Sequence, residues 1–153
     1  MEFEYRASLP VAVNTLWTLL VDIPAVALCI PGVVSVEPLG EDRYRGVLKL
    51  RIGPVGLELG GQITVEELLA AERQLVFSGE AKDKRIPGGL RTRTQLVLTT
   101  LEPELTELLV VTEAHILGKL GEFGQSIIKR KTDQVMQQFT DNLARKAGEP
   151  TTT

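Results

Sequence analysis

The residues that form disulfides and most structural zinc sites are almost absent from this chain of 153 residues, which has one cysteine, Cys29, and one histidine, His115. A single cysteine cannot form an internal disulfide. One cysteine with one histidine cannot supply the four ligands of a usual structural zinc site. The composition therefore excludes a disulfide-stapled scaffold and predicts no metal site.

An excess of basic charge and a long hydrophobic run are also missing. The chain has 17 Lys and Arg against 20 Asp and Glu, a net charge of −3, which argues against nucleic acid as a partner. Its longest uncharged stretches, 7–21 and 23–36, are interrupted by proline and fall short of the roughly 18 apolar residues that a membrane-spanning helix needs. Residues 1–6 carry glutamates where a secretory signal has basic residues. We therefore expect a cytoplasmic protein.

The chain does contain enough apolar material for one core. Hydrophobic residues make up 43% of it, and its length is typical of a single domain, which we place at residues 1–147. Residues 148–153 have the low-complexity sequence GEPTTT. This composition predicts a disordered tail.

The periodicity of apolar residues predicts strands for most of the domain. Alternation over residues 2–9 indicates a first strand, after which Pro10 introduces a helix and Asp22 is placed to cap a second short helix. Alternation returns over residues 33–116, where short turns divide it into six further strands. Turns this short join only antiparallel neighbours, so we expect an antiparallel sheet with one apolar face.

After Gly118 the period changes to that of a helix. One amphipathic helix of about 28 residues, or ~42 Å, is predicted there, long enough to cross the whole apolar face of the sheet. Three consecutive basic residues, 129–131, are expected on its solvated side. Its apolar stripe consists of Leu120, Phe123, Ile127, Ile128, Val135, Phe139 and Leu143.

These elements predict an α+β fold in which a seven-stranded antiparallel sheet wraps around a long C-terminal helix, with two short helices after the first strand. Their order resembles the START-like (SRPBCC) helix-grip fold. Three stretches are more specific: CIPGV at 29–33, IGPV at 52–55 and GKLGEFG at 118–124. Together they resemble the CoxG family, named for the G-subunit of carbon monoxide dehydrogenase, over about residues 1–146.

This resemblance implies an accessory protein and not an enzyme. Members of the family are associated with molybdenum-containing carbon monoxide dehydrogenases and related hydroxylases, and link the enzyme to the membrane by holding a quinone or another lipid-like molecule. We therefore expect a hydrophobic small molecule as ligand, no tightly bound cofactor, and a molybdenum hydroxylase as partner. Contact with the membrane is expected to be peripheral, at its inner face.

Residues that point inward from the predicted sheet and helix define a candidate ligand cavity. Its walls are expected to be apolar with a few threonine hydroxyls, which suits a quinone or a similar ligand with few polar atoms. The expected lining residues are Trp17, Leu50, Leu59, Ile63, Phe77, Thr92, Thr94, Leu96, Val110, Thr112, Gly121, Phe123, Gly124 and Ile127.

Two features of this lining have purely structural alternatives. Gly118, Gly121 and Gly124 each cost about 1 kcal/mol relative to alanine in a helix. They either let the helix approach the sheet closely or widen the cavity. The threonines either contact a ligand or bond internally, because β-branched residues fit strands well.

No catalytic set is visible among the inward residues of the sheet, which include no acidic, basic or histidine side chain. His115 is expected on the outward face of its strand, and Cys29 is expected to be a small buried hydrophobe. Two alternatives stay open. A polyketide-cyclase-like START enzyme would have a charged side chain in the cavity, and a protein-interaction module would have no cavity above about 300 Å³.

Basic residues gather around the turn at 86–89. They could contact anionic lipid head groups or an acidic partner, or they could simply keep the hairpin solvated. The residues are Lys82, Lys84, Arg85, Arg91 and Arg93.

Overall fold

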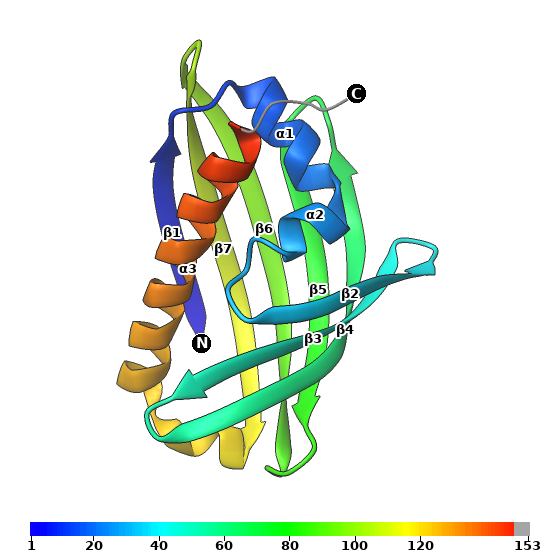
Figure 1. Ribbon diagram of the computed structural model, residues 1–153, viewed down its shortest axis with the longest axis vertical. Helices are drawn as coiled ribbons and strands as arrows, with labels where there is room; N and C mark the ends of the chain where they lie inside the picture. Colours follow the sequence, from blue (N-terminus) through cyan, green and yellow to red (C-terminus); the bar gives the residue numbers. More distant parts are fainter. Residues whose placement is uncertain (149–153) are drawn as a thin grey trace.

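Seven antiparallel strands form one sheet in the order β1-β7-β6-β5-β4-β3-β2 (Figure 1), in the computed structural model that describes residues 1–148. The strands are β1 (Glu2–Leu9), β2 (Val33–Gly40), β3 (Arg43–Ile52), β4 (Val55–Leu69), β5 (Gln74–Asp83), β6 (Gly88–Glu102) and β7 (Leu105–Gly118). The helices are α1 (Val13–Val21), α2 (Ile23–Ala27), the 3-10 helix η1 (Lys119–Phe123) and α3 (Gln125–Ala147). The predicted fold class, strand number and strand direction are confirmed.

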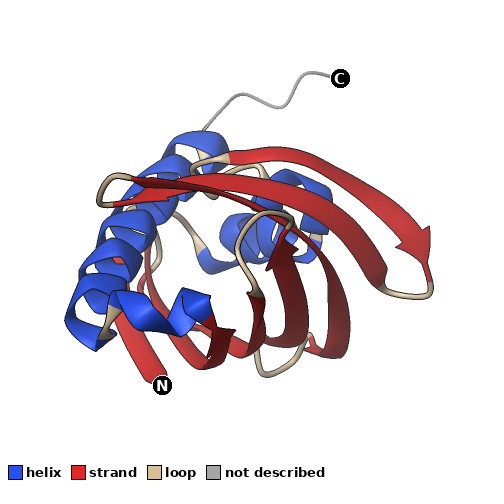
Figure 2. Ribbon diagram, turned by 90° about the horizontal axis from the view of Figure 1, so that it is seen from below, coloured by secondary structure: helices blue, strands red, loops and turns tan. Residues whose placement is uncertain are grey.

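The sheet curls around the helices (Figure 2). α3 lies along one side of the curve, next to β1, while α1 and α2 lie inside one end. Each strand after β1 pairs with the next along the chain, and β1 closes the order by pairing with β7, with Glu2 opposite Glu113 and Leu9 opposite Thr106. The curved sheet and α3 therefore enclose an interior whose walls come from both ends of the chain.

The second short helix begins as the sequence predicts. The Asp22 carboxylate oxygen Oδ1 accepts a hydrogen bond from the backbone N–H of Ala25 at 3.3 Å, and Pro24 occupies the first turn. This cap satisfies an amide that the helix itself leaves unpaired. Cys29, just after this helix, is buried, and His115 is exposed, as expected.

Two inward glycines lie where the backbone of a neighbouring strand leaves no room for a side chain. Gly46 of β3 pairs with Gly61 of β4. A Cβ atom on Gly61 would lie 1.9 Å from the backbone oxygen of Glu80, and one on Gly46 would lie 2.9 Å from that of Ser35. Real Cβ atoms do not approach this closely, so only glycine permits the curvature. We call Gly46 and Gly61 the glycine crease.

The predicted long C-terminal helix is confirmed, but it begins at Gln125 and not just after Gly118. Gly124 has φ 87° and ψ 151°, a conformation open almost only to glycine, and it separates η1 from α3. α3 has 23 residues and is therefore about 35 Å long. The stripe residues Leu120 and Phe123 belong to η1 and not to the long helix. Ile127, in the first turn of α3, is 47% exposed.

This break predicts the effect of substituting Gly124. A Cβ atom there would meet nothing within 4 Å, so the cost of Gly124→Ala comes from the backbone alone and should be about 1–3 kcal/mol in urea unfolding. The control is Gly148→Ala, because Gly148 caps α3 with a negative φ of −83°. Equal stabilities of the two variants would contradict the assigned break.

The buried core is divided into two clusters. The larger cluster packs α1 and α2 against the sheet and the end of α3, and includes Leu16, Leu20, Leu108 and Leu143. The smaller cluster contains Leu57, Leu59 and Leu120, where the β3–β4 hairpin meets η1.

The predicted tail is described only at its first residue. The backbone N–H of Gly148 donates to the carbonyl oxygen of Ala144 at 3.1 Å, so this residue belongs to the end of α3. Residues 149–153 lie outside the described part of the chain.

Candidate functional site

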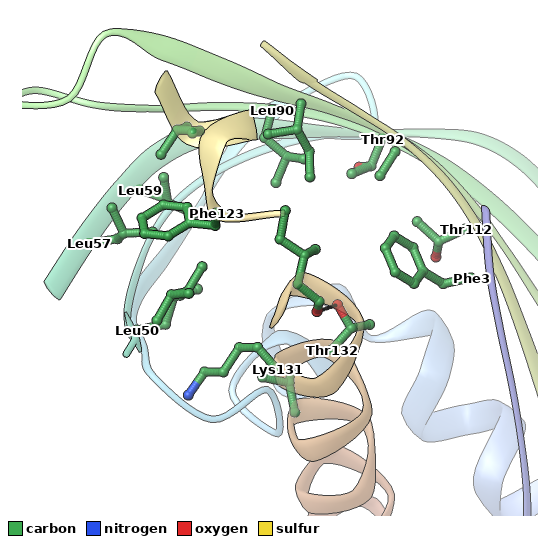
Figure 3. A pocket seen from close by; sticks show the side chains of 16 residues that line it. Phe3, Leu50, Leu57, Leu59, Leu90, Thr92, Thr112, Phe123, Lys131 and Thr132 are labelled. Carbon is green, nitrogen blue, oxygen red and sulfur yellow. Dashed lines mark hydrogen bonds between the residues drawn. The ribbon is translucent and has the colours of Figure 1, made fainter. Parts of the chain in front are cut away.

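An interior cavity of about 230 Å³, here called lobe A, lies between α3, η1 and the strands β3, β4, β6 and β7. Figure 3 shows its side chains: Leu50, Leu57 and Leu59 form one wall, and Thr92, Thr112 and Phe3 form the opposite one. The lining is hydrocarbon apart from threonine hydroxyls and one lysine.

Two further lobes adjoin it. Lobe B, about 210 Å³, lies under β2–β5, and lobe C, about 200 Å³, lies between α2, α3 and β5–β7. Lobes A and B share Leu59 and Thr92, lobes A and C share Thr112 and Val135, and lobes B and C share Ile63. No single lobe reaches 300 Å³; the three lobes share lining residues and so lie next to one another at the centre of the fold.

Most of the predicted lining residues are brought together in these lobes. Those that line at least one lobe are Leu50, Leu59, Ile63, Phe77, Thr92, Thr94, Leu96, Val110, Thr112 and Phe123. They come from β3–β7 and η1, where the alternation places every second residue inward.

Four predicted residues line none of the three lobes. Trp17 is buried in the larger core cluster, where the guanidinium carbon of Arg73 lies 5.8 Å from the ring centroid. Gly121, Gly124 and Ile127 are exposed, because the break before α3 turns them away from the interior. Gly121 and Gly124 therefore do not widen any of the three lobes, which was one of the two roles considered for them.

Of the predicted lining threonines, two hydrogen-bond to each other and one is left for a ligand. Thr94 and Thr112 hydrogen-bond to each other across β6 and β7, with their Oγ1 atoms 3.0 Å apart. Thr92 has no hydrogen-bond partner for its hydroxyl within residues 1–148, and it borders both lobe A and lobe B. Gly79 makes room for this hydroxyl, since a Cβ on Gly79 would lie 3.0 Å from it. Thr92 is therefore available to a ligand.

The predicted lining set contains five of the sixteen residues of lobe A, and three of those it omits come from β1 and from the polar residues of α3. Phe3 comes from β1, and Lys131 and Thr132 come from α3. Lys131 was expected on the solvated side of the helix, but it is half-buried and lines the cavity, because it lies three residues after the buried Ile128 on the same face of α3. The spacing of the stripe could have revealed both α3 residues, since positions 131 and 132 fall between Ile128 and Val135.

The basic hairpin is largely neutralised by partners within the chain. Arg91 pairs with Glu80 at 3.5 Å and Arg93 pairs with Glu66 at 3.1 Å. Arg85 lies 3.7 Å from Asp83 and donates to the Gly56 carbonyl oxygen at 2.7 Å. The other two basic residues, Lys82 and Lys84, are exposed and have no ion-pair partner among the described residues.

A buried carboxylate that the sequence did not reveal holds the turn of this hairpin. Asp83 Oδ2 accepts from the backbone N–H of Glu58 at 2.8 Å, and its Oδ1 accepts from those of Arg85 at 2.7 Å and Ile86 at 3.1 Å. The hydrogen bond from Glu58, followed by those from Arg85 and Ile86, holds the pKa of this carboxyl below its ordinary value of 3.8.

The lowered pKa predicts how the stability depends on pH. The ionised Asp83 stabilises the fold above its unfolded-state pKa, and this contribution is lost as the pH falls through its lower folded-state pKa. Asp83→Asn should therefore unfold at lower urea concentration than the natural protein at pH 7, with the difference shrinking below about pH 4. Asp133→Asn, on an exposed helix face, is the control. A difference that stays constant with pH would contradict this role.

The sequence matches the profile of the CoxG family, the G-subunit of carbon monoxide dehydrogenase, over residues 8–148. The chain belongs to the CoxG family. This match spans every element from the end of β1 to the end of α3, and so includes the lining of all three lobes except Phe3. No curated protein matches the chain in sequence.

Solved structures place this CoxG family member among START-like proteins. A conserved protein from Geobacillus kaustophilus is 22% identical with a TM-score of 0.87, and the match covers 96% of this chain and 95% of that one. A START superfamily protein from Mycobacterium smegmatis is 12% identical with a TM-score of 0.69, covering 95% and 96%. The Zhui aromatase/cyclase from Streptomyces sp. R1128 is 13% identical with a TM-score of 0.68, covering 96% and 93%. These likenesses establish the START-like fold.

The charged groups around the cavity bear on the alternatives. Within residues 1–148, Lys131 is the one charged side chain lining lobe A, and lobe C has none. Lobe B borders Arg45 and Glu80, which are exposed and form ion pairs on the outer surface, with Glu37 and Arg91. No helix in this part of the CoxG chain is long and apolar enough to cross a membrane.

Proposed function

We propose that this protein binds a hydrophobic, lipid-like small molecule in the space formed by lobes A, B and C. The observation that carries the proposal is an adjoining set of apolar lobes at the centre of the fold, with the unpaired hydroxyl of Thr92 at the junction of lobes A and B. An apolar ligand would cover hydrocarbon walls at about 25 cal/mol for each Å² of apolar surface removed from water.

The polar groups of the site define which lipid-like molecules fit. Thr92 can donate one hydrogen bond, and in the Thr94–Thr112 pair one hydroxyl donates to the other, which leaves the accepting hydroxyl one hydrogen to donate. A ligand with a long apolar part and few oxygen acceptors matches this set. A quinone meets that description, since its ring carbonyl oxygens accept hydrogen bonds, and it is the first neutral compound to test.

The protein's role in this proposal is that of a non-catalytic accessory. Acid–base catalysis needs groups that can exchange protons within reach of one another, and lobes A and C contain no carboxylate or imidazole from the described residues. Membership of the CoxG family supports a molybdenum-containing carbon monoxide dehydrogenase, or a related hydroxylase, as the enzyme it assists.

A peripheral membrane contact at the inner face forms part of the same proposal. Lys82 and Lys84 project from the end of β5 and the turn beyond it without partners in the described chain, and each basic residue near an anionic surface contributes about 1 kcal/mol. Flotation with anionic liposomes should carry the protein at low salt and release it at high salt. Absence of binding at both salt concentrations would remove this part of the proposal.

Organic extraction of the purified protein, followed by mass spectrometry, tests the main proposal. We expect a lipid-like molecule in the extract, and a rise in melting temperature when decylubiquinone is added. Ligand at 100 times its Kd stabilises a protein by about 2.7 kcal/mol. An empty extract together with an unchanged melting temperature would refute ligand binding.

A further inference from the structure

Lys131 is an unexpected side chain for a hydrocarbon-lined cavity. It lines lobe A together with leucines, isoleucines and phenylalanines, and it is half-buried. A residue that both lines a cavity and is half-exposed lies where the cavity meets solvent. In Figure 3 the Lys131 side chain extends from α3 toward the side of the pocket where Leu50 is drawn, and α3 contacts β3, so this edge lies between α3 and β3.

No acidic side chain neutralises this ammonium in the described part of the chain. The neighbouring Lys129 pairs with Asp133 at 3.3 Å, but Lys131 makes no ion pair. Its helical neighbours three and four positions away are Ile127, Ile128, Gln134 and Val135, and none of them is acidic. The charge is therefore left to solvent or to a ligand.

We infer that Lys131 selects a ligand with an anionic head group, such as the carboxylate of a single-chain amphiphile. The head group would lie at the solvent edge beside Lys131, and the hydrocarbon chain would extend into lobe A toward Thr92. This inference rests on the proposed cavity ligand and narrows its class. It predicts that a carboxylate-bearing lipid binds more tightly than a neutral lipid of the same length.

The geometry favours this division between the head group and the chain. Thr132, next to Lys131, donates its hydroxyl to the Ile128 carbonyl oxygen at 2.8 Å, so it offers little to a ligand. The ammonium is thus the one strong donor at the α3 side of lobe A. Hydrogen bonds to an ionised partner are roughly twice as strong as neutral ones, and a lysine acts as a mobile point charge that adapts to one oxygen or two.

The test compares decanoate with decanol, which have the same chain length but a charged and a neutral head group. Isothermal titration calorimetry at neutral pH should show tighter binding of decanoate by the natural protein. Lys131→Met, which keeps a straight apolar side chain with similar helix propensity, should weaken decanoate binding about tenfold and leave decanol binding unchanged. Lys131→Arg should keep the preference for decanoate.

Lys129→Met is the matched control, because it removes a charge two positions away that does not line the cavity. It should bind both probes as the natural protein does. Equal decanoate affinity in Lys131→Met and the natural protein would overturn the role of Lys131. If the natural protein binds both probes equally, the anionic preference fails and the proposed function stands. If it binds neither, both fail.

Salt provides a second measurement that does not need a variant. Added sodium chloride should weaken the binding of decanoate to the natural protein and leave that of decanol unchanged, because the ammonium lies at a solvent-exposed edge where ions screen it. Decanoate binding that is insensitive to salt would overturn the inference even if the Lys131→Met variant did not fold.

Discussion

Replacing Gly61 with alanine is expected to destabilise the protein by about 3 kcal/mol or more. The added Cβ would lie 1.9 Å from the Glu80 carbonyl oxygen and 2.8 Å from the Ala81 Cα, both of which are backbone atoms of the neighbouring strand. A flexible side chain could turn away, but β5 is held between β4 and β6 and cannot move without breaking its ladder. Urea unfolding followed by circular dichroism measures the loss.

The neighbouring glycine provides a matched control. A Cβ atom on Gly60 would meet nothing within 4 Å, because this residue faces outward from the same strand. Gly60→Ala should therefore be neutral or slightly stabilising, by about 0.5 kcal/mol, since alanine restricts the unfolded chain. Similar stabilities of the two variants would show that the glycine crease does not require a missing side chain.

Replacing Ala114 with phenylalanine is expected to reduce the affinity for a lipid-like probe by about 100-fold while the fold persists. Ala114 is 5% exposed, lines lobe A and lies opposite Thr92 across β6 and β7. A ring at this position would occupy the space that the ligand needs. Overpacking costs about 1–3 kcal/mol, which is less than the stability of a typical domain.

Calorimetry with decanoate and decylubiquinone measures this loss, and urea unfolding verifies that the variant folds. His115→Phe is the control, because it introduces the same ring on the same strand but on the exposed outer face. That variant should bind both probes normally. A folded Ala114→Phe variant with unchanged affinity would place the ligand outside lobe A.

The sheet could be predicted from the sequence because its signal is local. Alternation alone assigns Leu50, Ile63 and Thr92 to one face, and the short turns leave only antiparallel neighbours. Since a slip of one residue would expose the whole apolar face, the register follows from the same pattern. The predicted lining from β3–β7 therefore agrees closely with the lobes.

The errors arose where a backbone angle or a distant partner decides the structure. The glycine at 124 could belong to a helix at a cost of about 1 kcal/mol, and nothing local reveals that its φ is positive. The break leaves Ile127 exposed, whereas the inward position of Lys131 follows from its spacing of three from Ile128 and was overlooked. Asp83 was missed in part because one of its partners, Glu58, lies 25 residues away, although its bonds to Arg85 and Ile86 are local.

The pairing of β1 with β7 has a consequence for how the binding site is assembled. Lobe A takes Phe3 from β1 and Lys131 from α3, so its walls come from nearly opposite ends of the sequence. Strands β2–β7 can pair as successive hairpins. β1 pairs with β7, about 100 residues further along the chain, and contacts between residues this far apart in the sequence form slowly. A chain in which β1 has not yet paired lacks the wall of lobe A that Phe3 forms. A ligand that contacts Phe3 in lobe A would therefore bind molecules in which β1 has paired, and would stabilise that state.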